Sequence, residues 1–127
     1  MTDDEFLRDF EARALREFHH RDHIRLAWLR VKESGAAAEG RVAGDIQAFA
    51  ARAGASRKYH ETITQFWVKL VRHADEAFRP ADVDELTSRC PLLLDQSALL
   101  RHWSQPALMS DTARARWLEP DLVALPF

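Results

Sequence analysis

The sequence contains little that would tie the chain to a disulfide framework or a membrane. It has one cysteine, Cys90, so no disulfide can form within the chain, and a reducing compartment is the simplest expectation. No apolar run approaches the roughly 20 residues that a membrane span requires. The acidic start "MTDDEF" also lacks a signal-peptide pattern. We therefore expect a cytoplasmic protein with no membrane partner.

An excess of positive charge is also missing. The 18 Lys and Arg residues are outnumbered by 20 Asp and Glu residues, which gives a formal net charge of −2. The basic residues are dispersed among acidic ones, whereas a protein that holds nucleic acid by its phosphates presents a basic face. We therefore expect no nucleic-acid partner.

Glycine and proline are scarce and unevenly distributed. The four glycines lie within residues 35–54 and the five prolines within residues 80–126, which favours longer helices first and short, proline-started helices later. No segment alternates apolar and polar residues for long enough to predict a strand. The prediction is an all-α chain with a single helical domain over residues 1–127. It would be a helical bundle of four longer helices, followed by several short C-terminal helices and an extended tail.

Capping residues and apolar periodicity set the expected limits of these helices. The first longer helix is expected to follow the capping box Thr2–Glu5, and the second to run from a break before Arg21 to Ser34. The third is expected over about 39–53. The fourth is expected to begin at the N-cap Ser56 and to stop at Pro80. The shorter ones are expected at the capping box Asp82–Glu85, from Pro91 to about Trp103, and at "SQP" and "SDT". The tail "EPDLVALPF" is rich in apolar residues, so we expect it to pack across the helices or across a second subunit.

Histidines are concentrated at the expected starts of the second and fourth helices. The stretch "FHHRDHIRLAW", residues 18–28, holds three of them, and "KYHETITQFW", residues 58–67, holds one. At about 100° per residue, His20 lies near the centre of the apolar stripe of its helix and His23 lies to one side. His60 shares the apolar face of its own helix. The pattern therefore predicts histidines from two helices on inward faces.

A buried pocket centred on these histidines is the leading hypothesis. Helix N-termini and partial burial both disfavour the imidazolium form, so His20 and His60 should be neutral at pH 7. A neutral imidazole can act as a general base, a metal ligand or a hydrogen-bonding core residue. The candidate catalytic residues are His20, His60 and His23. The candidate substrate-binding residues are Tyr59, Thr64, Trp28, Trp67 and Ala27, which would combine hydroxyls, aromatic walls and a small side chain that leaves space.

The same three histidines are also candidate metal ligands. His20 and His23 are spaced i, i+3, and with His60 they would give a divalent metal ion three nitrogens and an open position. The cofactor is otherwise unknown, and the pattern leaves open whether the protein is an acid–base or metal-assisted enzyme or only binds a small-molecule ligand. The alternative is a helical interaction module, a homodimer or adaptor, in which the histidines are structural. Cys90 precedes a proline, which is typical of a helix boundary rather than of a nucleophile.

Three separated motifs resemble an uncharacterised family of small bacterial helical proteins. They are F-x-H-x-x-H-I-R-x-A-W at Phe18–Trp28, K-Y-H-E-T-I-T at Lys58–Thr64, and S-D-x-A-R-x-x-W-x-E-P-D-L at Ser110–Leu122. The resemblance spans nearly the whole chain and implies one domain. It places emphasis on His20, His23, Tyr59, His60 and Thr64, and it implies no particular reaction, cofactor or substrate.

Overall fold

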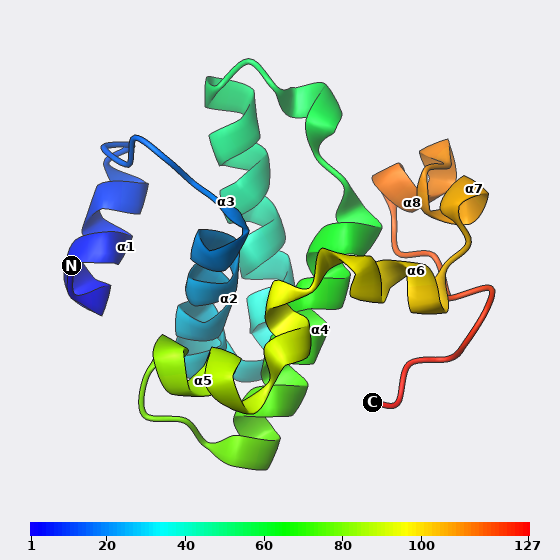
Figure 1. Cartoon of the computed structure of the whole chain (residues 1–127). Helices are drawn as coiled ribbons and strands as arrows, with labels where there is room; N and C mark the ends of the chain where they lie inside the picture. Colours follow the sequence, from blue (N-terminus) through cyan, green and yellow to red (C-terminus); the bar gives the residue numbers. More distant parts are fainter.

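The computed structural model describes all 127 residues, and its regular elements are all helical (Figure 1). The α-helices are α1 (Asp3–Glu11), α2 (His20–Ser34), α3 (Ala38–Arg52), α4 (Glu61–Phe78), α5 (Val83–Arg89), α6 (Leu99–His102), α7 (Gln105–Leu108) and α8 (Asp111–Ala115). Short 3-10 turns cover Gly35–Ala37, Ser56–Lys58, Pro91–Leu94 and Gln96–Ala98. The predicted all-α class is confirmed. No helix is long and apolar enough to cross a bilayer.

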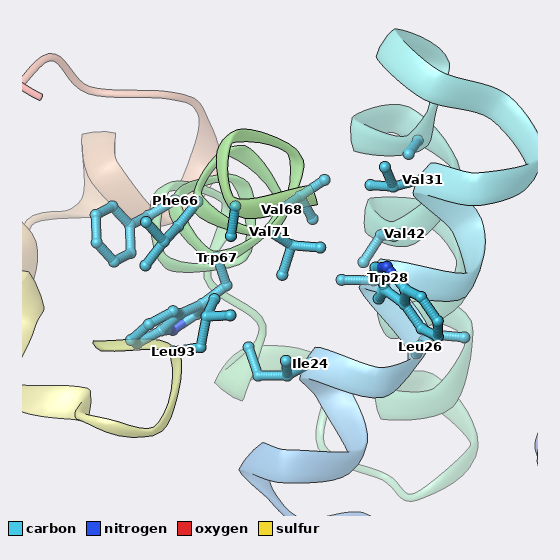
Figure 2. Close-up of a cluster of buried hydrophobic side chains, with 14 of the residues drawn as sticks. Ile24, Leu26, Trp28, Val31, Val42, Phe66, Trp67, Val68, Val71 and Leu93 are labelled. Carbon is cyan, nitrogen blue, oxygen red and sulfur yellow. The ribbon is translucent and has the colours of Figure 1, made fainter. Parts of the chain in front are cut away.

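Helix α2 lies at the centre of the molecule and packs most extensively against α4 and α3. Its apolar stripe meets α4, and Figure 2 shows Val68 and Val71 of α4 directed toward Trp28 and Val42. The far side of α2 is covered by α1, where the Arg25 guanidinium lies 4.7 Å from the centroid of the Phe6 ring. Because α4, α3 and α1 all pack against α2, six consecutive residues, 26–31, are all buried. Tertiary contacts therefore bury more of this helix than one amphipathic stripe would.

Most predicted helix starts are confirmed by their caps. The Thr2 hydroxyl accepts from the Glu5 N–H at 3.1 Å and the Glu5 carboxylate returns a bond to the Thr2 N–H, so the first capping box is complete. The Asp82 carboxylate caps α5, and Ser104 and Ser110 cap α7 and α8. The break between the first two helices lies at residues 12–19, and α2 ends at Ser34 as predicted.

Two predicted limits are wrong. Ser56 begins a 3-10 turn rather than α4, because Tyr59 is extended and the imidazole of His60 provides the cap of α4 instead. The helix predicted from Pro91 to Trp103 is divided into two 3-10 turns and the four-residue α6. The division occurs at Asp95, whose carboxylate accepts from the Ser97 N–H at 3.0 Å and so replaces a helical hydrogen bond with a local turn.

The tail after α8 is non-helical and docked, as predicted. The His102 carbonyl accepts from the Leu122 N–H at 2.9 Å, and His102 Nδ1 donates to the Val123 carbonyl at 2.8 Å. The Asp121 carboxylate accepts from the Ser104 N–H and hydroxyl at 2.8 and 2.6 Å. Burial is less complete than predicted, because the Leu122 and Val123 side chains stay 56% and 57% exposed. Polar anchors therefore hold the tail together with the partly buried Leu118 and Leu125, which pack against the core.

Candidate functional site

A solvent-open cleft of about 520 Å³ lies between the N-terminal ends of α2 and α4, α3 and the C-terminal short helices. Eleven of the 18 residues that line it are hydrophobic. The lining includes seven of the eight predicted site residues, namely His20, His23, His60, Ala27, Tyr59, Thr64 and Trp67. The two histidine-bearing stretches, about 40 positions apart in the sequence, therefore lie on the walls of one cleft.

Trp28 is the predicted site residue that lies outside the cleft. Its side chain is fully buried in the α2–α4 core (Figure 2), and its indole N–H donates to the Asp75 carboxylate at 2.9 Å. The prediction that it would wall the pocket is wrong, because in an α-helix the next residue after Ala27 projects about 100° away from it.

His60 uses both ring nitrogens for structure. Its Nδ1 accepts from the Ile63 N–H at 3.1 Å, which caps α4, and its Nε2–H donates to the Leu108 carbonyl at 2.6 Å, which tethers α7. The residue is 6% exposed, and burial lowers its pKa. A neutral imidazole with both nitrogens bonded has no lone pair left for a metal or for a substrate proton. The geometry therefore favours a structural role for His60 over the predicted catalytic one.

His20 and His23 each keep one ring nitrogen without a protein partner. Nε2–H of His20 donates to the Leu93 carbonyl at 2.7 Å, and Nδ1–H of His23 donates to the His19 carbonyl at 2.9 Å. Because a carbonyl only accepts, the opposite nitrogens carry lone pairs. No buried side-chain nitrogen or oxygen lacks a partner, so Nδ1 of His20 and Nε2 of His23 reach solvent.

Aromatic neighbours fix both of these rings. The His20 ring packs edge-on against Trp67 with the centroids 4.6 Å apart, and the His23 ring lies 4.2 Å from that of Phe18. Burial lowers the pKa of both histidines, and the proximity of His20 lowers the pKa of His23 further. Both imidazoles are therefore neutral acceptors at neutral pH.

The two predicted hydroxyls line the cleft with their hydrogens already in use. The Tyr59 hydroxyl donates to the Glu61 carboxylate at 2.5 Å, and burial together with this bond raises the pKa of Tyr59. The Thr64 hydroxyl donates to the His60 carbonyl at 2.8 Å. Each oxygen still has acceptor capacity, so Tyr59 and Thr64 can accept from a ligand in this arrangement but have no hydrogen left to donate.

The predicted metal site is not assembled. No group of three or more His, Cys, Asp or Glu side chains has the arrangement to hold a metal ion. The physical reason lies in His60, whose two nitrogens are occupied, so that His20 and His23 lack the third nitrogen expected from α4. Cys90 is also a poor nucleophile, because burial raises its pKa and keeps the thiol protonated.

Part of the cleft was missed by the sequence analysis. One wall comes from the C-terminal short helices and includes Leu99, Leu100, Leu108 and Met109, with Gln96 and Gln105 at the exposed edge. These residues carry no motif. Part of the segment that holds them, from Pro91 to Trp103, was predicted to be one regular helix. The tether from His60 to Leu108 links this wall to α4, and a long-range bond of this kind has no periodic signal in the sequence.

The lowered pKa values predict that acid destabilises the fold. His20, His23 and His60 resist protonation in the folded chain, whereas the unfolded chain takes up protons near the ordinary value of 6.5. The unfolded state then binds more protons, so the free energy of unfolding is largest above about pH 6.5 and falls as the pH drops toward the lowered pKa values. Urea titrations at about pH 7.5 and about pH 5.5 should show this loss.

A matched variant separates the histidine effect from the general effect of acid. Replacing His20 by Gln and His23 by Asn keeps a side-chain amide donor for each backbone carbonyl and removes two of the three rings whose pKa is lowered. The pH dependence should shrink in this double variant. An equal loss of stability in both chains would show that these rings do not couple protonation to folding.

Comparison with known proteins gave no match among family models, curated proteins or solved structures. The resemblance drawn from the three motifs therefore stays a prediction.

Proposed function

We propose that this protein binds a small, mostly apolar molecule in the cleft beside His20 and His23. The observation that carries the proposal is the cleft itself, whose volume of about 520 Å³ and mainly hydrophobic lining are combined with two ring nitrogens that lack a partner. Ligand sites have this combination of an apolar wall and a few placed polar groups, typically at about 300–1,000 Å³. An interaction module with structural histidines would instead have a filled core at this position.

Acid–base chemistry is a second step that the cleft could support. His20 and His23 are the candidates for it, because each has a lone pair that reaches solvent. Their lowered pKa values make them weak bases, so a substrate proton would have to be acidic for either ring to remove it. His60 would then act as a positioning residue that holds the α7 wall.

A solvatochromic dye tests the binding proposal without knowledge of the ligand. Nile red is neutral and apolar, and its emission rises and shifts to the blue when it leaves water. We expect saturable binding of one dye per chain. Replacing Ile63, which lines the cleft, by Trp fills part of the space and should abolish or strongly weaken the binding.

The matched control places the same large side chain on the same helix outside the cleft. Phe78 at the end of α4 is 41% exposed and does not line the cleft, so Phe78→Trp should bind the dye as the parent does. Far-UV circular dichroism and thermal melts verify that both variants fold. No dye binding to the parent, or equal weakening in both variants, would contradict the proposal.

A further inference from the structure

The half-buried and buried polar side chains that line the cleft are almost entirely hydrogen-bond acceptors. Four of them, two ring nitrogens and two hydroxyl oxygens, come from side chains whose own hydrogens are already donated to protein groups. They belong to His20, His23, Tyr59 and Thr64. His60, the remaining polar side chain of this set, has both nitrogens bonded and has neither a donor nor an acceptor to offer.

The side chains of the cleft that can still donate are exposed to solvent. Lys58, Gln96 and Gln105 line it and are exposed, so water competes for their N–H groups. No carboxylate lines the cleft, and its only charged side chain is the Lys58 ammonium. A cationic ligand would therefore gain no ion pair and would be repelled at the entrance.

We infer that the ligand of this cleft carries no positive charge and has an apolar body and at least one hydroxyl or N–H group that donates to Nδ1 of His20 or Nε2 of His23. This inference rests on the proposed function. Its physical basis is the cost of leaving acceptors unpaired in a cleft that loses its water when an apolar body enters. A ligand without a donor displaces that water and leaves the two nitrogens without a partner.

A pair of probes that differ in one hydrogen-bond donor tests this. 2-Naphthol and 2-methoxynaphthalene have the same aromatic body and are both neutral at neutral pH, but only the naphthol can donate. Each is titrated against bound Nile red to obtain its dissociation constant. We expect 2-naphthol to bind about tenfold more tightly than the ether, the size of effect expected for one hydrogen bond of this kind.

Variants that keep the structural hydrogen bond of each histidine assign the recognition. In His20→Gln the amide N–H can keep the bond to the Leu93 carbonyl, and in His23→Asn it can keep the bond to the His19 carbonyl, while each change removes the acceptor from the position of the other ring nitrogen. We expect at least one of the two variants to lose most of the preference for 2-naphthol, with little change in the affinity for the ether.

The outcomes separate this inference from the function on which it rests. Failure of the parent protein to bind Nile red and both naphthalene probes overturns the proposed function and the inference together. Dye binding with equal affinities for the two probes leaves the proposed function in place and overturns the inference. A preference that survives in both variants overturns the assignment to His20 and His23.

Discussion

Replacing His60 by alanine is expected to lower the free energy of unfolding by about 2–4 kcal/mol. The change removes the acceptor that caps α4 at the Ile63 N–H and leaves the Leu108 carbonyl without the imidazole donor. Loss of an N-cap costs about 1 kcal/mol, and an unpaired buried polar group costs about 1–3 kcal/mol. Urea denaturation followed by tryptophan fluorescence measures the difference.

His60→Asn is the control that divides this loss into its parts. Asparagine is a good N-cap, so the α4 cap should be retained while the bond to α7 is lost. We expect a destabilisation smaller than that of His60→Ala by about 1 kcal/mol. If His60→Ala melts like the parent, the two hydrogen bonds contribute little, and His60 must be reconsidered as a residue kept for chemistry rather than for folding.

Helix type and most helix limits could be predicted because local physics determines them. Thr2, Asp82 and Ser110 cap helices through hydrogen bonds to residues three positions later, and such bonds can be anticipated from the sequence. The start of α4 could not be predicted in this way. Ser56 and His60 both have a side-chain acceptor that could cap the helix. Which of them does so depends on α7, because the Leu108 carbonyl of α7, 48 positions away in the sequence, accepts the second hydrogen bond of His60.

For the candidate site, the sequence predicted several of the residues that line the cleft but not which hydrogen bonds they make. Helical geometry placed His20, His60 and Trp67 on inward faces, and all three line the cleft. Geometry along one helix does not reveal which ring nitrogens find backbone partners, so it could not show that His60 is fully bonded or that the metal site lacks a ligand. The rotation of a side chain about its own bonds depends on contacts from distant elements.

Arg30 is the clearest case of a residue that only the fold explains. It lies in the fully buried part of α2 with 1% of its surface exposed, and its guanidinium donates to the Asp45 carboxylate at 2.8 Å. Glu33 and Glu11 lie at 3.2 and 3.3 Å. Of the three acidic partners, only Glu33 has helical spacing from Arg30. The sequence therefore gave no sign of the other two partners, from α1 and α3, which compensate for the burial of the charge.

Deleting residues 119–127 is expected to lower the melting temperature by roughly 5–10 °C, because each kcal/mol lost shifts the midpoint by several degrees in a domain of this size. The deletion removes Asp121, which accepts two hydrogen bonds from Ser104 at the start of α7, and it removes the backbone partners of His102. It also removes Phe127, which stacks on His73 of α4 with the rings 4.9 Å apart. Differential scanning calorimetry measures the shift.

Substitutions within the tail distinguish the contribution of its hydrogen bonds from that of its exposed apolar side chains. The double variant Leu122→Ser, Val123→Ser changes two side chains that are more than half exposed and keeps the backbone bonds to His102, so it should melt close to the parent. Asp121→Ala should reproduce part of the effect of the deletion, because it removes both bonds to Ser104.

If the truncated chain melts unchanged, the anchors contribute no net stability. If Leu122→Ser, Val123→Ser alone lowers the midpoint as much as the deletion, these side chains are covered in solution, as they would be if the tail packed against a second subunit.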